Sequence, residues 1–322
     1  MRTIHALCCC ALVLAAGAAG ADPGTLKGYM YGDYYYVVSA DDGEANYPEK
    51  QNAFRYRRIY LTYNRDLSDD FSMRYRLEAN DGGYGKGDKM NPFVKHAYLR
   101  WRGAMVGSDV YLGLAGTPTW GVSERVWGYR SIEATIMDVR KYGSSADLGV
   151  ALKGKAGSLA YHFMVGNGPG QKPEEDNGKK LYASVDFVGI EGIHLEGYVD
   201  YSMRPADQNK MTLKGFLGLE REGFRAGVEP FIRIHQEATP GEDQTLTGVS
   251  VFGALDLSSS LAGFGRVDMI NDDVGDTTDL LLIAGLDHSP AKDIHLMPNL
   301  YVNIPDGPDP SIQARLTMFY KF

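Results

Sequence analysis

Three shortages mark this 322-residue sequence, and each of them excludes a class of protein. The only cysteines are Cys8, Cys9 and Cys10, so the rest of the chain has no thiol for a disulfide or a Cys–metal framework. Lys and Arg total 33 against 41 Asp and Glu. This acidic balance argues against a nucleic-acid partner, because phosphates require a basic face. Repeated apolar runs of about 20 residues are missing, which excludes a polytopic helical membrane protein.

Tyrosine and glycine, in contrast, are abundant, with 21 Tyr and 39 Gly. The mean hydropathy of −0.28 is ordinary. A chain that is rich in aromatics and glycine and moderately polar is typically rich in β-structure. Its length is compatible with one large unit or with two ordinary domains.

The first residues have the pattern of a secretory signal peptide. A short, partly basic start and an apolar stretch over residues 6–16 precede Ala19-Gly20-Ala21, which offers small residues for cleavage. We therefore expect residues 1–21 to be removed, leaving a mature chain of residues 22–322 that is exported and contains no cysteine. A lipoprotein is the alternative, but lipid attachment requires a cysteine at the end of the apolar stretch, and here the cysteines lie within it.

Alternation of apolar and polar residues recurs along the chain and indicates β-strands. Its clearest example runs from Phe71 to Asn80, where every second residue is apolar. Similar segments begin near Leu26, Phe54, Phe93, Val110, Asp147, Leu159, Leu181, Ile193, Met211, Phe224, Gly248, Leu261, Asp279, His295 and Ile312. Together these segments predict about sixteen strands of the length that crosses a membrane, about 9–11 residues.

The end of the sequence shows the same alternation. From Ile312 the apolar residues fall on every second position and end with Phe322. A final aromatic residue on the apolar face of the last strand resembles the terminal signature of bacterial outer-membrane barrels. The alternative is the last strand of a soluble sandwich.

Connections between these strands alternate in length. Short turns are predicted at Arg65–Asp70, Gly103–Asp109, Lys155–Gly157, Val188–Gly192, Arg221–Gly223, Asp256–Ser260 and Ser289–Asp293. Longer polar loops are predicted at Ser39–Ala53, Asp81–Pro92, Pro118–Ser144, Asn167–Gly178, Ser202–Lys210, Gln236–Gln244, Ile270–Asp276 and Pro305–Pro310. Short turns at one rim and long loops at the other are typical of membrane barrels with an even number of strands.

The predicted fold is therefore all-β: a sixteen-stranded antiparallel transmembrane β-barrel over residues 22–322, with short periplasmic turns, long outer loops and an inward-folded third loop. A propeller would need a blade-like repeat, and none is evident. A soluble sandwich would need a core too large for one domain. Sixteen strands enclose an aqueous channel rather than a packed interior.

Several short motifs then suggest a family. Arg57-Arg58-Ile59-Tyr60-Leu61, Asp66-Leu67-Ser68-Asp69-Asp70-Phe71-Ser72, Val94-Lys95-His96-Ala97-Tyr98-Leu99, Arg130-Ser131-Ile132-Glu133, Asp147-Leu148-Gly149-Val150 with Gly154, and Gly166-Asn167-Gly168 follow in order. This arrangement resembles the phosphate-selective porin O and P family and the wider group of sixteen-stranded porins, over about a third of the chain.

The resemblance implies a homotrimer in the outer membrane of a Gram-negative-type bacterium, in contact with lipid, that passes small hydrophilic and often anionic solutes by diffusion. One departure matters. Where the family usually has Gly-Gln-Phe/Lys-Thr-Pro, this chain has Gly113-Leu114-Ala115-Gly116-Thr117-Pro118. An uninterrupted ladder of basic residues is also missing, so phosphate specificity is not carried over.

The polar phase of the strands supplies the candidate pore-lining residues. Four basic residues come from adjacent strands: Arg58, Arg74, Arg76 and Arg100. Five acidic residues come from strands roughly opposite: Asp186, Glu196, Asp200, Glu220 and Glu229. A basic wall facing an acidic wall would create a transverse field that orients dipolar solutes. Alternatively, these charges pair between neighbouring strands and only solvate the wall.

The third long loop, residues 118–144, is called loop three below. It carries more apolar surface than solvent tolerates, in Trp120, Trp127, Tyr129, Ile132, Ile136, Met137 and Val139. We expect it to fold into the barrel and narrow the pore. Its charges would then line the constriction: Glu124, Arg125, Arg130, Glu133, Asp138, Arg140 and Lys141. Packing on a neighbouring subunit is the alternative.

These patterns favour an outer-membrane porin for passive diffusion of small hydrophilic solutes or ions. A phosphate-selective or anion-selective channel is the alternative within this class. A barrel enzyme using His96 or His235, or a non-conducting surface adhesin, are alternatives from other classes. The histidines lack metal-ligand spacing, and no catalytic motif occurs, so we expect no enzymatic activity, no cofactor and no metal.

Overall fold

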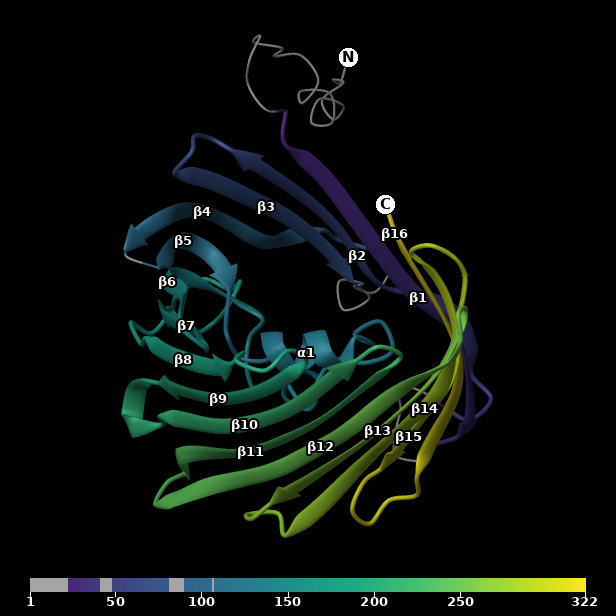
Figure 1. Cartoon of the computed structure of the whole chain (residues 1–322). Coiled ribbons are helices and arrows are strands. Elements are labelled where there is room, and N and C mark those ends of the chain that lie inside the picture. Colours follow the sequence, from purple (N-terminus) through teal and green to yellow (C-terminus); the bar gives the residue numbers. More distant parts are fainter. Residues whose placement is uncertain (1–22, 41–47, 81–89, 106) are drawn as a thin grey trace, which may run out of the picture.

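A computed structural model describes residues 23–40, 48–80, 90–105 and 107–322. The predicted signal peptide, residues 1–21, lies outside the described residues. Sixteen antiparallel strands form one closed barrel, in which each strand pairs with the next and β1 also pairs with β16 (Figure 1). The predicted fold class is therefore confirmed. No helix in the described part of the chain is long and apolar enough to cross a membrane.

The strands follow one another in order around the barrel. The first eight are β1 Thr25–Ser39, β2 Asn52–Asp66, β3 Phe71–Asn80, β4 Phe93–Met105, β5 Ser108–Gly116, β6 Ala146–Ala156, β7 Leu159–Gly166 and β8 Lys180–Phe187. The second eight are β9 Ile193–Ser202, β10 Lys210–Arg221, β11 Phe224–Thr239, β12 Glu242–Ser258, β13 Leu261–Asp272, β14 Thr277–Ala291, β15 Ile294–Ile304 and β16 Ser311–Lys321. Loop three contains α1 Gly121–Trp127 and α2 Ile136–Val139, and a 3₁₀ turn, η2, covers Pro205–Asp207.

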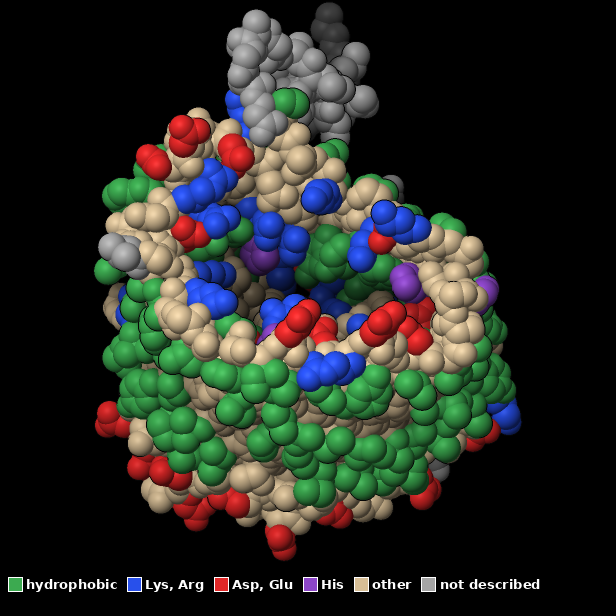
Figure 2. Space-filling model, viewed as in Figure 1, with side chains coloured by type: hydrophobic (Ala, Val, Ile, Leu, Met, Phe, Trp, Pro, Cys, Tyr) green, Lys and Arg blue, Asp and Glu red, His purple; other side chains and the backbone are tan. Residues whose placement is uncertain are grey.

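Alternation places apolar side chains on the outer face of the barrel. On β9, Leu195 is exposed while its neighbour Glu196 is buried, and on β10 exposed Leu217 follows buried Phe216. Repeated around the sixteen strands, this pattern produces a belt of hydrophobic side chains on the outer surface (Figure 2). Such a belt is stable only against an apolar surrounding.

The two rims differ as the sequence predicts. Tight turns such as those at Gly157 and Gly223 join alternate pairs of strands, and both glycines have a left-handed φ, of 58° and 68°, that a side chain would strain. The last strand closes the barrel at this rim, where the backbone of Phe322 exchanges hydrogen bonds with Gly28 at 2.8 and 2.9 Å. Longer connections, including loop three, leave from the other rim.

Two predicted long loops are mostly strand. β11 continues to Thr239 and β12 begins at Glu242, so the loop predicted at residues 236–244 shrinks to a two-residue turn. The loop predicted at residues 270–276 shrinks to residues 273–276. Polar residues occupy both faces of these hairpins, because both faces meet water beyond the apolar belt. The alternation of apolar and polar residues therefore ends before the hydrogen-bonded strands themselves end.

Bulges in β2 and β4 interrupt the alternation. Tyr31 pairs with Arg58 and Gly32 with Tyr56, so Arg57 is the extra residue of β2. In β4 the pairing moves from His96 to Val94, and Lys95 is extra. A bulge lets two consecutive side chains point to the same face, so each of these strands presents two adjacent basic or imidazole side chains to the interior.

Loop three lies inside the barrel, where α1 is seen through the opening of Figure 1. Its apolar side chains pack against the inner faces of the strands in two clusters. Trp127 and Ile132 join one cluster with Phe216, Phe252 and Phe264. The other cluster contains Trp120, Ile136, Met137, Tyr182, Tyr198 and Phe231. The prediction of an inward-folded third loop is confirmed.

Candidate functional site: the charged interior beside loop three

Polar contacts fix the central segment of loop three between two walls of the barrel. On one side, Arg57 donates to the carbonyl oxygens of Ser131 and Ile132 at 3.1 and 2.6 Å. On the other side, Arg266 donates to the carbonyl oxygen of Ala134. Gly128 ends α1 in a left-handed conformation, with φ 70°. This geometry reverses the chain so that the loop can span the interior.

Two of the four predicted basic residues have no acidic partner among the residues that the structure describes. Arg74 donates from Nε to Asn64 Oδ1 at 2.8 Å, and Arg76 donates from Nε to Thr62 Oγ1 at 2.7 Å. Both acceptors are neutral, and no carboxylate of the described residues pairs with either guanidinium. These two arginines are therefore oriented by hydrogen bonds while their positive charge remains available to a solute.

The other two predicted basic residues have acidic partners. Arg58 Nε lies 2.9 Å from Glu78, and Lys95 shares the same carboxylate at 3.1 Å. Two cations against one anion leave this group net positive. Arg100 pairs with Asp109, which cancels its charge. The basic wall thus carries its excess charge on Arg74, Arg76 and the Arg58–Lys95 pair.

Three charges of loop three, Glu124, Arg130 and Asp138, lie near Arg58 of this wall. Arg130 lies between Glu124, at 3.0 Å, and Asp138, at 2.9 Å. The surrounding protein removes water from Glu124 and, together with the charge of Asp138, raises its pKa above the ordinary 4.5, although Arg130 and Arg58 act in the opposite sense. Glu124 therefore gains a proton at a higher pH than an ordinary glutamate does.

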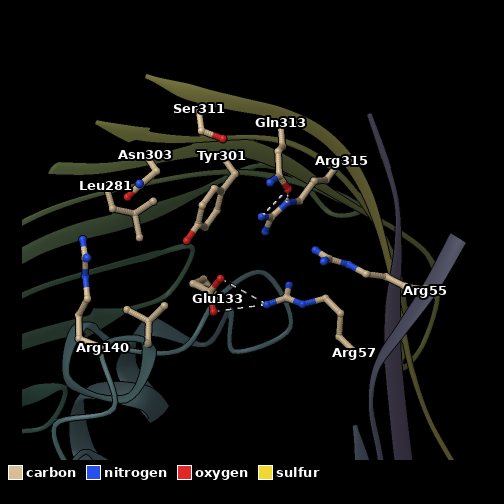
Figure 3. Close-up of a pocket in the computed structure, with 11 residues that line it drawn as sticks. Arg55, Arg57, Glu133, Arg140, Leu281, Tyr301, Asn303, Ser311, Gln313 and Arg315 are labelled. Carbon is tan, nitrogen blue, oxygen red and sulfur yellow. Dashed lines mark hydrogen bonds and ion pairs between the residues drawn. The ribbon is translucent and has the colours of Figure 1, made fainter. Parts of the chain in front are cut away.

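A cavity of about 370 Å³ lies between loop three and strands β2, β14, β15 and β16 (Figure 3). Four arginines and one carboxylate contribute to its wall: Arg55, Arg57, Arg140, Arg315 and Glu133. Arg140 pairs with Asp279 at 3.2 Å, and Arg57 with Glu133 at 3.3 Å. Burial would raise the pKa of Glu133, but the charges of Arg57 and Arg315 outweigh it and hold that pKa below its ordinary value.

Arg315 is the cation of this cavity without a carboxylate partner in the described part of the chain. Its guanidinium lies over the ring of Tyr301 at 3.9 Å and donates to Gln313 Oε1 at 3.0 and 2.8 Å. The side chain is 8% exposed, and its Nη1 has no hydrogen-bond acceptor among the described residues. A buried donor without an acceptor is costly, which an anion in the cavity would relieve.

On the acidic wall, four of the five predicted carboxylates are buried, and three of these have a cationic partner or a histidine. Glu196 pairs with Lys214 at 2.7 Å and Asp200 with Lys180 at 3.0 Å. Asp186 lies 3.2 Å from His194. Glu229, 1% exposed, lies on β11, the strand on which α1 packs. The pairing between neighbouring strands, proposed as the alternative to a transverse field, thus occurs on this wall.

Glu220 and Arg125 lie together near the short-turn rim. Glu220 is 3.1 Å from His194 Nε2, and Arg125 Nη2 is 3.3 Å from His194 Nδ1. Figure 2 shows the opening of the barrel at this rim. Blue side chains gather on the left of the mouth and red ones at its lower edge. A separation of charge therefore exists at the short-turn mouth, whereas deeper in the barrel three of the four buried carboxylates are paired.

Sequence reasoning missed Arg57, Arg55 and Lys95 because it extended one alternating phase through each strand. The signal was present in Arg57-Arg58 and Lys95-His96: two adjacent polar residues between apolar neighbours of opposite phase.

Lys141, the last predicted charge of loop three, lies apart from the others and lines a second cavity. Pore-lining and constriction roles for all these side chains stay predictions.

Histidine, cysteine and carboxylate side chains are the usual protein ligands of metal ions. Among the described residues, no three His, Cys, Asp or Glu side chains are arranged to hold a metal ion. His96 lies beside Lys95 at the bulge of β4 and is buried, while His235 opposes Lys210 near the long-loop rim. The two histidines named for the enzyme alternative thus lie on different strands.

Solved outer-membrane proteins share this barrel. The outer membrane channel DcaP of Acinetobacter baumannii matches with a TM-score of 0.71 and 13% identity, over 95% of this chain and 98% of that chain. An anion-selective porin from Comamonas acidovorans matches with 0.69 and 12%, over 93% and 99%. Salmonella typhi OmpF, in complex with daunomycin, matches with 0.66 and 12%, over 93% and 97%.

These identities establish the fold alone, and the fold is the sixteen-stranded barrel of outer-membrane porins. No family model and no curated protein matches the sequence. The resemblance of the motifs to the phosphate-selective porin O and P family is thus supported at the level of the porin barrel, while membership of that family is not.

Proposed function

We propose that this protein is an outer-membrane porin through which small hydrophilic solutes diffuse, with a preference for anions. The observation that carries the proposal is the pair Arg74 and Arg76. Their guanidinium groups are fixed on the inner wall and have no carboxylate partner among the described residues. Fixed charge of one sign in a narrow passage selects ions of the opposite sign.

Other features of the barrel support a channel rather than an enzyme or an adhesin. The apolar belt fits a membrane, and the interior is lined by charged groups on both sides of loop three. Sixteen strands are also too many for side chains alone to fill the interior. Loop three reduces the opening, so that solutes pass close enough to the wall to feel charges screened over about 10 Å at 0.1 M salt.

The solved porin-fold structures are consistent with this proposal. One is an anion-selective porin and another an outer membrane channel. Assembly into a homotrimer, contact with outer-membrane lipid, and export after removal of residues 1–21 belong to the same proposal.

Single-channel recording in planar bilayers tests it. We expect stepwise conductance from the purified full-length protein, and a reversal potential in a tenfold KCl gradient that has the sign of chloride preference. A folded protein that never conducts would favour the adhesin. Cation preference would contradict the role assigned to Arg74 and Arg76.

A further inference from the structure

A second cavity, of about 650 Å³, lies at the long-loop end of the barrel. We call it the lateral cleft. Its walls are the end of loop three, from Lys141 to Ser144, the loop between β7 and β8, and the inner faces of β8 to β11. It is separate from the cavity of Figure 3, since the two share no lining residue. Its volume lies within the range of about 300–1,000 Å³ that is usual for small-molecule sites.

The lining of the lateral cleft is strongly positive. Six cations and two carboxylates contribute to it: Lys141, Lys172, Lys180, Arg204, Lys210 and Arg233, with Asp176 and Asp200. Asp200 is already engaged, because it pairs with Lys180 at 3.0 Å and accepts a hydrogen bond from Tyr198 at 2.6 Å. None of the other five cations has a carboxylate within ion-pair distance in the described part of the chain. Four positive charges are therefore in excess.

Two of these cations lie on neighbouring strands of the wall. The guanidinium of Arg233 lies 4.9 Å from the centre of the Tyr142 ring, which orients it beside the cleft. Lys210, at the start of β10, is partly buried and pairs across the strands with His235, two residues along β11 from Arg233. Like charges that are kept this close repel one another, and a concave wall concentrates their field. A bound anion with several charges would relieve that repulsion, whereas a single negative charge would leave most of it.

The cleft also offers apolar surface. Tyr142, Pro169 and Met203 contribute to its wall between the charged groups. An inorganic ion does not need such surface, but the carbon skeleton of an organic acid or an organic phosphate would pack against it.

We propose that the lateral cleft binds a small solute that carries two or more phosphate or carboxylate groups. The solute enters from the long-loop side and is held beside loop three by Lys210, Arg233 and Arg204. The site deepens the proposed function, since it names a class of anion that the porin would retain, but the binding itself does not require conduction.

Isothermal titration calorimetry on the full-length protein in detergent tests the proposal, with tripolyphosphate, citrate and acetate as probes at 0.05 M salt. We expect saturable binding of tripolyphosphate or citrate at one site per chain and none of acetate. If tripolyphosphate alone binds, the site takes phosphates; if citrate alone binds, it takes carboxylates. Lys210→Gln with Arg233→Gln should weaken binding at least tenfold.

The matched control is Lys155→Gln with Lys292→Gln, which removes the same charge from exposed positions at the short-turn rim. Its affinity should equal that of the unchanged protein. Arg204→Gln, on an exposed side chain, should weaken binding severalfold and replaces the double variant if that one fails to fold.

Equal loss of affinity in both double variants, or no saturable binding of any probe, would overturn the proposal. The reversal potential, measured without these probes, reports on the proposed anion preference separately. A channel without anion preference that still binds tripolyphosphate would refute the preference and leave the lateral cleft standing.

Discussion

At the scale of single residues, charge compensation separates side chains that the sequence presents as equivalent. Arg100 and Arg74 both alternate into the barrel, yet Arg100 has Asp109 as its partner and Arg74 has the neutral Asn64. Guanidinium groups keep their charge at any working pH. Their effect on a passing ion therefore depends on the partners that neighbouring strands provide.

The first prediction concerns selectivity. Reversing the charges of both uncompensated arginines, Arg74→Glu with Arg76→Glu, should shift permeation towards cations and keep conductance within about a few-fold, because the width of the passage is unchanged. The reversal potential in a KCl gradient measures the shift. Lys155→Glu with Lys292→Glu makes the same change of net charge at exposed positions and should have little effect. If both double variants have the same reversal potential, Arg74 and Arg76 form part of the barrel wall but do not select ions.

The second prediction concerns pH. Because the pKa of Glu124 is raised above 4.5, this carboxyl loses its charge at a pH where ordinary glutamates still keep theirs. Its partner Arg130 stays positive. We therefore expect anion preference to grow as the pH falls from neutral into the acidic range. Glu124→Gln should show the higher anion preference already at neutral pH, and its anion preference should no longer depend on the pH. If the anion preference of this variant still changed with pH, a titrating group other than Glu124 would be responsible.

At the scale of elements, loop three is held by packing as much as by charge. Trp127 is fully buried, 5.2 Å from the ring of Phe252 and 6.2 Å from that of Phe264, and its Nε1 donates to the carbonyl oxygen of Glu133 at 3.0 Å. The strands have their own closed hydrogen-bond ladder, so loop three can loosen without opening the barrel.

The third prediction follows for this anchor. Trp127→Ala should remove about 3–5 kcal/mol of packing from loop three, a typical cost for such a truncation. Channel current should become noisier and protease should cleave within residues 118–144, while the thermal unfolding of the barrel changes little. Trp101→Ala, at a position 44% exposed on the outer face, is the control and should leave loop three intact. Protease resistance equal to that of the unchanged protein would show that Trp127 is not the anchor.

The fourth prediction concerns the width of the passage. Replacing residues 124–138 by a short Gly-Ser linker should raise single-channel conductance several-fold, since this segment spans the interior. Folding is verified by the migration of unboiled protein on a gel. Conductance that stays the same in a folded variant would mean that the limiting section lies elsewhere.

At the scale of the whole molecule, closure removes every free strand edge. The backbone ladder is complete around the barrel, and the apolar belt on the outside needs lipid or detergent. Unfolding should therefore be slow and cooperative.

The fifth prediction is that unboiled protein in detergent migrates differently from boiled protein on a gel, and that the material purified from membranes starts near Asp22. N-terminal sequencing and fractionation check both points. Recovery in the soluble periplasmic fraction would contradict the outer-membrane location.

Local alternation was sufficient to predict the sixteen strands, the short-turn rim and the outward apolar face, because side chains alternate in any strand and lipid demands an apolar outer phase. The apolar side chains within residues 118–144 likewise predicted a buried loop, and the structure decided that the barrel interior, rather than a neighbouring subunit, buries them.

Only the tertiary structure decided which charged side chains have a partner of opposite charge and which do not. The bulges at Arg57 and Lys95 depend on how β1 pairs with β2 and β3 with β4, which no single strand encodes. The positions of loop three and its neighbours decided that Glu196 and Asp200 are buried beside lysines, and brought Lys141, Arg204 and Arg233 to one cleft from three separate segments. Electrostatic partners lie across strands and loops that are distant in the chain, so their effect emerges only when the barrel closes.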